Sequence, residues 1–183
     1  MNFHIRNEQP GDLEAITRVT EQAFLNAPHT SHTEQHIVNA LRQRGKLTIS
    51  LVAEAQGELI GHIAISPVAI QGHQSSGQAD AANIQNWYGL GPVSVHPDRQ
   101  GQGIGSALIR EALSCLQAHN NAAGCVLLGE PDYYGRFGFK PHPGLELPGV
   151  PPEYFMALGF GGETPVGVVK YDEAFELEAN ASN

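Results

Sequence analysis

Three glycines at every second position, Gly101, Gly103 and Gly105, are the residues whose spacing most clearly indicates chemistry. They follow the valine-rich segment 93–95 and precede apolar residues at helical spacing: Leu108, Ile109, Leu113 and Leu116. This pattern predicts a strand, a tight loop and a helix that begins at the glycines. Such a loop presents unpaired backbone N–H groups and the positive end of the helix dipole. The sequence therefore predicts an anion-binding loop.

Two common phosphate-binding loops do not fit this spacing. No Gly-Lys-Ser/Thr follows the glycines, so the Walker lysine is missing. The dinucleotide pattern G-x-G-x-x-G is not matched, and no Asp or Glu stands between Glu111 and Glu130, where a ribose-binding acid is expected. A nucleotide-binding protein that holds ATP or NAD on this loop is therefore a poor fit.

The pattern Gln100-x-x-Gly103-x-Gly105 resembles the Q/R-x-x-G-x-G/A motif of the GNAT superfamily of N-acetyltransferases. In that family the loop amides hold the pyrophosphate of coenzyme A. The resemblance implies cofactor contacts at the strand backbone and along the loop, namely at Val93, Ser94, Val95, Arg99, Gln100, Gly101, Gln102, Gly103, Ile104, Gly105 and Ser106. Arg99 either adds charge to the same phosphates or is a solvated loop arginine.

A second motif, Tyr134-x-x-x-Gly138-Phe139, is similar to the other GNAT signature, Y-x-x-x-G-F. The resemblance implies that Tyr134 lies beside the thioester sulfur and acts as the general acid. A phenol with a pKa near 10 is close enough to a thiol near 8.5 for proton transfer to the leaving thiolate. The alternative is an aromatic side chain that packs on the cofactor. Tyr133 is its neighbour but lacks the motif spacing.

A general base is harder to find, because residues 81–95 contain no carboxylate. Glu130, just past the predicted strand 125–128, is the candidate, since partial burial raises the pKa of a carboxyl group. Its alternative role is an exposed loop acid. A histidine such as His96 has an ordinary pKa that suits a general base, but His96 is expected to cap a strand instead. Glu34 either faces an acceptor or is a helix-surface acid. A mechanism without a dedicated base also stays open.

The residues before the loop predict the elements that position it. Alternation predicts strands at residues 3–6, 47–53 and 59–66, and Gln56-Gly57 supplies the turn of a hairpin. Helical periodicity predicts one helix from Leu13 to Phe24, with Asp12 as N-cap, and a second from about Ser31 to Arg44. Residues 71–83 predict a surface loop, and one hypothesis is that it closes over an acceptor.

The residues after the loop complete an order of elements that resembles the GNAT fold from end to end. Strands are expected at 87–95, 125–128, 154–158 and 166–171. The expected fold is α/β (α+β), a single domain over residues 1–183 whose mixed, mostly antiparallel sheet contains a splayed parallel pair and is flanked by helices. Gly89, Gly91 and Pro92 fit a ladder that is not continuous. The Pro-rich segment with Gly159–Gly162 is similar to a bacterial, YhbS-like subgroup.

Composition excludes several classes of partner. The net charge of −9, from 10 basic and 19 acidic residues, argues against nucleic-acid binding. The sequence shows no long apolar run and no signal peptide, so we expect a cytoplasmic protein without a membrane partner. The two cysteines match neither a metal site nor a disulfide framework. The histidines at 29, 32 and 36 lack further ligands at regular spacing, so no metal is expected.

The resemblance of these motifs to the GNAT superfamily implies an acetyl-CoA-dependent N-acyltransferase, and we expect it to transfer an acetyl group directly to a primary amine in a ternary complex. Neither cysteine stands beside the motifs, so a covalent acetyl-enzyme is not supported. A strand N–H near Val95 would polarise the thioester carbonyl. The acceptor is an amine-bearing small molecule or a protein or peptide, and the resemblance implies a homodimer. The rival hypothesis is a non-catalytic acyl-CoA-binding sensor or regulatory module.

Overall fold

The computed structural model describes residues 2–25, 27, 32–72, 83–119 and 121–178. The chain forms two compact units, which are described separately. Unit 1 consists of Met1–Ser66, Leu90–Leu116 and Asp172–Asn183, and unit 2 of Pro67–Gly89 and Gln117–Tyr171. Strand β6 (Trp87–Val95) contributes its first three residues to unit 2 and the rest to unit 1.

The strands of unit 1 are β1 (His4–Asn7), β2 (Ile49–Ala55), β3 (Glu58–Pro67) and the second part of β6. β1 pairs with β2, and β2 with β3, in antiparallel register. The predicted hairpin is confirmed, and its turn residues Gln56 and Gly57 adopt φ values of 55° and 81°. This left-handed pair suits the right-handed twist of the flanking strands.

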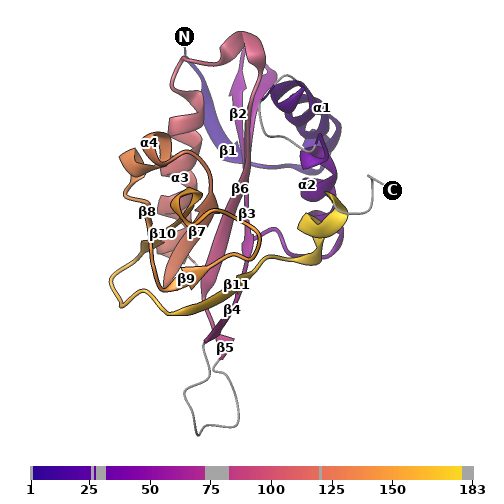
Figure 1. The fold of residues 1–183 in the computed structure, drawn as a ribbon. Coiled ribbons are helices and arrows are strands. Elements are labelled where there is room, and N and C mark those ends of the chain that lie inside the picture. The colour runs from indigo at the N-terminus through magenta and orange to yellow at the C-terminus, as the bar shows by residue number, and fades with distance from the viewer. Residues whose placement is uncertain (1, 26, 28–31, 73–82, 120, 179–183) are drawn as a thin grey trace, which may run out of the picture. The chain divides into compact units, whose positions relative to one another are not determined.

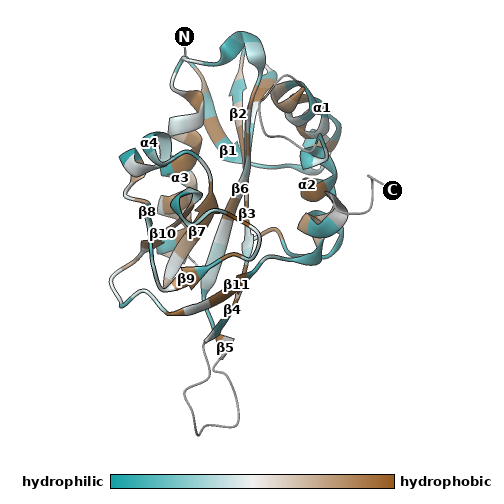
Figure 2. Cartoon of the chain, in the orientation of Figure 1, coloured by the Kyte–Doolittle hydropathy of each residue, from teal (hydrophilic) through white to brown (hydrophobic). Residues whose placement is uncertain are grey.

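Helices cover both faces of these strands (Figure 1). On one face, α1 (Leu13–Phe24) and α2 (Glu34–Gln43) bury Ile16 and Val38 against Val52 of β2 and Ala64 of β3. On the other face, α3 (Ile104–His119) packs on β3, where a Cβ at Gly61 would lie 3.0 Å from Leu108 Cδ1. Alternate residues along β3 therefore face opposite sides of the sheet and pack against different helices. α1 carries its apolar and polar residues on different sides (Figure 2).

The second helix begins later than its periodicity predicts. The expected start near Ser31 falls outside the described residues, and α2 begins at Glu34 with Thr33 as N-cap. Its last turn is followed by Gly45 with φ of 64°, the left-handed residue that commonly ends a helix. The 3₁₀ segment η5 (Glu173–Glu178), which periodicity did not indicate, buries Ala174 against α2.

The first sheet continues in unit 2 with β7 (Gly124–Leu128), β10 (Phe155–Gly159) and β8 (Lys140–Pro141). The order of the whole sheet is β1-β2-β3-β6-β7-β10-β8. β7 and β10 are antiparallel, whereas β6 and β7 are parallel and pair at Trp87–Gly124, Tyr88–Cys125 and Gly89–Val126. The expected mixed, mostly antiparallel sheet with one parallel pair and flanking helices is confirmed.

A second sheet was not predicted. It has the order β5-β4-β11-β9 and is formed by β4 (Ala69–Gly72), β5 (Asn83–Ile84), β11 (Gly167–Lys170) and β9 (Leu145–Glu146). The expected loop at 71–83 is therefore strand at both ends, and residues 73–82 lie outside the described residues. The closing strand expected at 166–171 is present as β11, and it pairs with β4 and β9.

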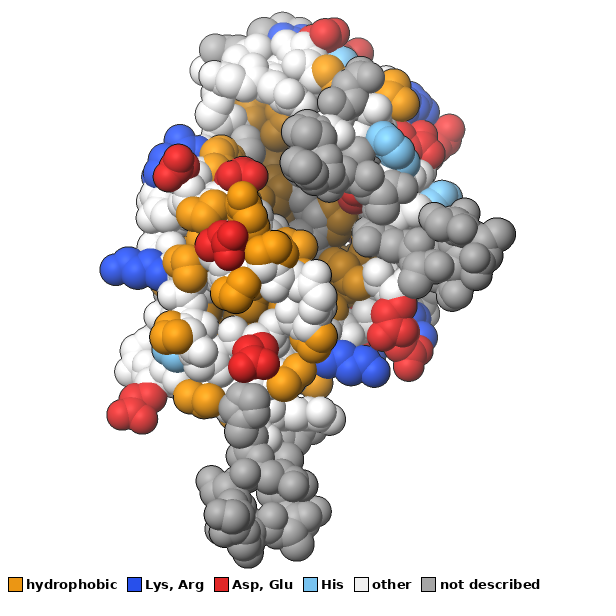
Figure 3. All heavy atoms as spheres, viewed as in Figure 1, with side chains coloured by type: hydrophobic (Ala, Val, Ile, Leu, Met, Phe, Trp, Pro, Cys, Tyr) orange, Lys and Arg blue, Asp and Glu red, His pale blue; other side chains and the backbone are white. Residues whose placement is uncertain are grey.

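The core of unit 2 joins its two sheets. Trp87 and Val126 of the first sheet pack with Ile70 and Val169 of the second. The Trp87 ring occupies the space where a Cβ of Gly124 would stand, so the small residue permits the close approach. Figure 3 shows hydrophobic side chains gathered on the outer face of this part of the molecule, with acidic side chains among them. Among the described residues, no helix is both long and apolar enough to cross a bilayer.

Candidate cofactor loop and catalytic site

The glycine loop of unit 1 has the backbone that its sequence predicts. Gly101 and Gly103 adopt φ values of 74° and 82°, in the left-handed region that L side chains rarely enter. A Cβ at either position would meet no atom within 4 Å, so no packing inside the protein demands a glycine there. The backbone conformation is therefore what favours glycine at these two positions.

Helix α3 begins at Ile104, at the end of this loop. The Gly103 carbonyl accepts the Ala107 N–H at 3.0 Å and closes the first turn. The N–H groups of Ile104, Gly105 and Ser106 have no acceptor within the helix, as at any helix N-terminus. Ile104 is buried to 2% exposure and so anchors the first turn to the core. The result is a fixed row of N–H donors beside an exposed loop, which suits an anion.

Side chains of the loop hold it in place. The Gln100 amide donates to the Val95 carbonyl at 3.1 Å, and the Gln102 amide donates to the Asp98 carbonyl at 3.3 Å. His96 Nδ1 accepts the Asp98 N–H, so His96 caps the short turn that follows β6. The Gln100 side chain, expected to contact phosphate, is thus occupied with tying the loop to the end of the strand.

Strand β6 ends directly before the loop, beyond the three residues, Trp87 to Gly89, that pair with β7. Ser94 is fully buried, and its hydroxyl donates to Thr20 Oγ1 of α1 at 3.2 Å. Its side chain therefore belongs to the core of unit 1. Val93 and Val95 are half-buried, as is Arg99 in the turn.

Tyr134 lies on the short helix α4 (Pro131–Tyr134) in unit 2. The Glu130 carbonyl accepts the N–H groups of Tyr133 and Tyr134 at 3.1 and 3.0 Å, and Gly138, with φ of 93°, ends the turn that follows. The Tyr134 ring meets Tyr133 edge-on, with centroids 4.9 Å apart. Burial, with a smaller contribution from Tyr133, raises the pKa of Tyr134 to about 12. The phenol is therefore protonated at neutral pH.

The two candidate carboxylates lie in different settings. Glu130 is exposed, as its alternative role as a loop acid implies. Glu34 is only 8% exposed, and the interpretation as a helix-surface acid is wrong. The reason is that α2 starts at Glu34, and its first turn, including Gln35, packs inward.

Two glycines make room for tyrosine rings in unit 2. A Cβ on Gly129, just past β7, would collide with the Tyr134 ring, and a Cβ on Gly89 of β6 would collide with the Tyr171 ring. Tyr171 carries no motif, so sequence reasoning passed over it. The Tyr171 ring lies on Gly89, which is part of the β6–β7 pairing. The Tyr134 ring lies on Gly129, which directly follows β7.

Metal ligands are not assembled in the part of the chain that the structure describes. No group of three or more His, Cys, Asp or Glu residues there could hold an ion. Of the three clustered histidines, His29 lies outside the described residues. Cys115 is on α3 and Cys125 on β7, each in a different unit from the other.

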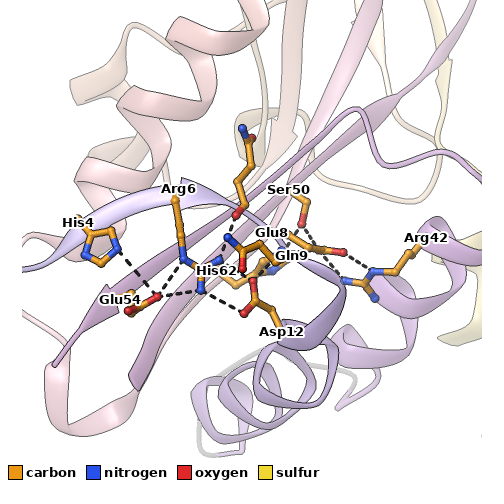
Figure 4. Close-up of polar contacts among 10 residues, drawn as sticks. His4, Arg6, Glu8, Gln9, Asp12, Arg42, Ser50, Glu54 and His62 are labelled. Carbon is orange, nitrogen blue, oxygen red and sulfur yellow. Dashed lines mark hydrogen bonds and ion pairs between the residues drawn. The ribbon is translucent and has the colours of Figure 1, made fainter. Parts of the chain in front are cut away.

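A hollow of about 490 Å³ in unit 1 is the alternative place for a ligand, and Arg6, Asp12, Glu54 and His96 line it. Arg6 binds Asp12 Oδ2 at 2.6 Å and Glu54 Oε2 at 2.9 Å (Figure 4). These partners raise the pKa of Arg6, with the Asp12 hydrogen bond contributing most. Because its charge is already matched, Arg6 is a weak phosphate ligand, and the glycine loop is the better anion site.

The structure thus groups the expected cofactor residues, 93–95 and 99–106, at the end of β6 and the start of α3 in unit 1. It places Tyr134 and Glu130 together at the start of α4 in unit 2. Each group is contiguous in sequence.

Comparison with known proteins identifies the family of the chain. Residues 46–141 match the model of the acetyltransferase (GNAT) domain. The chain is 36% identical over 137 residues to the uncharacterised N-acetyltransferase YhbS of Escherichia coli K12, which covers 74% of this chain and 72% of the relative. It is 32% identical over 144 residues to YjhQ of the same strain, another uncharacterised N-acetyltransferase, covering 76% and 69%.

Solved structures agree along nearly the whole chain. A GNAT family acetyltransferase from Brucella melitensis in complex with acetyl-CoA has a TM-score of 0.79 and 47% identity, covering 95% of this chain and 98% of that one. YhbS from E. coli in complex with CoA has a TM-score of 0.77 and 30% identity, covering 96% and 93%. With both motifs in the expected elements, the chain belongs to the GNAT family of acetyltransferases.

Proposed function

We propose that this chain transfers an acetyl group from acetyl-CoA to a primary amine by direct attack in a ternary complex. The observation that carries the proposal is the exposed loop at the start of α3, where Gly101 and Gly103 are left-handed and open to an approaching phosphate. The acetyl-CoA and CoA complexes of the Brucella and E. coli proteins support the choice of substrate. Residues 1–183 act as one domain in this proposal, in the cytoplasm and as a homodimer.

Acetyl-CoA binds along β6 in this proposal. The amides of residues 101–106 hold its pyrophosphate, and the β6 backbone at Val93–Val95 pairs with the pantetheine amides. A strand N–H near Val95 donates to the thioester carbonyl and stabilises the oxyanion that forms there. Arg99 adds positive charge near the phosphates.

The reaction forms a C–N bond and breaks a C–S bond. The amine nitrogen attacks the thioester carbonyl carbon, and the tetrahedral intermediate expels the coenzyme A thiolate. The amine gives up one proton to a base, and the thiolate takes one from an acid. The products are an N-acetylated amine and coenzyme A.

Tyr134 is the proposed donor to the leaving sulfur. With its pKa at about 12, full proton transfer to a thiolate of pKa near 8.5 is uphill by roughly 5 kcal/mol. Hydrogen-bond donation to the developing thiolate is therefore the larger part of its role. Glu130 is the proposed base and, being exposed, would accept the amine proton through solvent.

The test is an acetyl-transfer assay. Wild type and Tyr134→Phe are incubated with acetyl-CoA and fractionated amines and peptides, and products are detected by mass spectrometry. We expect a product whose rate falls about a hundredfold with Tyr134→Phe while acetyl-CoA affinity is unchanged. The control is Tyr133→Phe, which keeps full rate.

Other outcomes separate the alternatives. Acetyl-CoA binding without any product in any fraction would support the non-catalytic acyl-CoA-binding module. A Glu130→Gln variant with full activity at every pH would assign the base elsewhere or to solvent. A wild type that binds neither coenzyme A nor acetyl-CoA would overturn the proposed function.

A further inference from the structure

Arg136 contacts Tyr133, the neighbour of Tyr134, at two points within unit 2. Its Nε donates to the Tyr133 carbonyl at 3.1 Å, and its guanidinium carbon lies over the Tyr133 ring, 4.3 Å from the centroid. The hydrogen bond reaches a carbonyl at the C-terminal end of α4, where carbonyls lack donors within the helix. The second contact is a cation–π interaction. Arg136 therefore holds both the backbone and the ring of Tyr133.

The Tyr133 ring in turn packs against the Tyr134 ring. Their centroids are 4.9 Å apart, and the ring planes make an angle of 81°. The Tyr134 ring also meets the buried ring of Phe139, with centroids 6.4 Å apart, and lies where a Cβ of Gly129 would stand. Phe139 is fixed by the core, whereas Tyr133 is half-buried and Arg136 is exposed. One wall around the Tyr134 ring therefore depends on a surface arginine.

The orientation of the Tyr134 phenol depends on such contacts because α4 has only four residues. A single helical turn is not stable without packing. Hydrogen bonds weaken steeply as the donor turns away from its acceptor. A displacement of a catalytic group by about 1 Å can lower a rate by about a hundredfold. A shift of the Tyr133 ring would therefore be felt at the Tyr134 hydroxyl.

We propose that Arg136 is a positioning residue, which holds the Tyr134 phenol in the orientation that suits donation to the leaving thiolate. The inference rests on the proposed function, in which Tyr134 is that donor. Arg136 acts through the Tyr133 ring and carbonyl, and the Tyr133 hydroxyl has no part in either contact. Tyr133→Phe therefore keeps the arrangement.

The kinetic test is a double-mutant cycle. The kcat and the KM for acetyl-CoA are measured for wild type, Arg136→Ala, Tyr134→Phe and the double variant, with the amine fraction that wild type acetylates. We expect Arg136→Ala to lower kcat about tenfold and to leave the KM unchanged, since it displaces a group that acts in the transition state. In the Tyr134→Phe background there is no hydroxyl to position, so the same change should lower kcat by less than about twofold.

A second readout needs no acceptor. In protein labelled with isotopes at tyrosine, Tyr134→Phe identifies the NMR ring signals of Tyr134 among those of the five tyrosines. Because the neighbouring rings shift these signals, Arg136→Ala should move them toward the values of an unfolded chain. The matched control is Lys140→Ala, which removes an exposed cation of β8 in the same unit and should change neither the signals nor kcat. If thermal melts show that Arg136→Ala does not fold, Arg136→Gln takes its place.

Three results would overturn the inference while the proposed function stands. An equal loss of kcat in the wild-type and Tyr134→Phe backgrounds would give Arg136 a role unrelated to the phenol. A raised KM for acetyl-CoA with kcat unchanged would assign Arg136 to cofactor binding. Unchanged Tyr134 signals in Arg136→Ala would show that the arginine does not hold the ring. A wild type that forms no product is the separate result that removes the proposed catalysis, and the NMR signals then still decide whether Arg136 holds Tyr134.

Discussion

Ser50 Oγ lies 2.9 Å from His62 Nε2 in the interior of unit 1 (Figure 4). The same hydroxyl donates its hydrogen to Glu8, so its oxygen accepts one from His62 Nε2–H. This arrangement assigns the neutral tautomer with hydrogen on Nε2. Nδ1 is then a buried acceptor for which no partner exists among the described residues. Burial, only partly offset by the charge of Glu8, lowers the pKa of His62 to about 4.

Acid should destabilise the protein through His62. Its pKa is about 4 in the folded state and near 6.5 in an unfolded chain, so between these values the unfolded state binds more protons. Stability is therefore full above pH 6.5 and decreases as pH falls toward 4, by on the order of 3 kcal/mol. Urea denaturation followed by circular dichroism across this range measures the slope. His62→Gln, which cannot titrate, should flatten it; a slope that persists would assign the effect to other groups.

Glu8→Ala should be strongly destabilising. Glu8 accepts Arg42 Nε at 2.6 Å and Arg42 Nη2 at 2.8 Å, with both side chains at least four-fifths buried. Removing the carboxylate leaves the Arg42 charge without this partner, a change that costs about 3 kcal/mol or more in buried pairs. Glu14→Ala breaks the exposed pair with Arg18 and should leave stability unchanged. Equal midpoints of urea unfolding for the two variants would contradict this expectation.

Gly103→Ala should weaken coenzyme A binding about tenfold or more, because it strains the loop and places a methyl group where the phosphates approach. Gly57→Ala is the matched control. Gly57 has φ of 81°, against 82° for Gly103, and neither position has an atom within 4 Å of a built Cβ. Both variants should lose similar stability, but only Gly103→Ala should lose affinity in calorimetric titration. If Gly57→Ala also lost affinity for coenzyme A, backbone strain would explain the effect, and a phosphate contact at Gly103 would not be supported.

Gly89→Ala should destabilise unit 2 by about 1–3 kcal/mol, since its methyl group would overlap the Tyr171 ring and overpack the core. Adding Tyr171→Ala removes the overlap. The double variant should therefore be less destabilised than the sum of the two single changes, with a coupling above 0.5 kcal/mol. Strict additivity in a double-mutant cycle would show that the two residues do not touch.

The glycine loop and the start of α3 were predictable because the backbone conformation of a segment restricts which residues it can hold. Gly101 and Gly103 adopt φ values that favour glycine, and Ile104 and Leu108 show helical spacing directly behind them. The start of α3 followed from these residues without knowledge of any distant contact. The family resemblance then added the ligand, which spacing alone does not name.

Contacts between distant segments were not predictable. Ser50 meets Glu8 across 42 residues and His62 across 12, and the only hint was a histidine inside an apolar strand. Glu34 is buried because the first turn of its helix packs inward. Strand β11 pairs with β4 and β9, which lie far from it in sequence. Such outcomes depend on which surfaces meet in three dimensions, and periodicity along one segment carries no information on them.

The position of Trp87 decides what can be observed spectroscopically. It is the one tryptophan in the sequence, and its ring is buried against Gly124 in unit 2. Intrinsic fluorescence therefore reports the unfolding of unit 2, whereas the ellipticity of α1, α2 and α3 reports mainly unit 1. Coincident transitions in the two signals would mean that the units melt as a single cooperative block, and separate transitions would resolve two energetic subdomains within one chain.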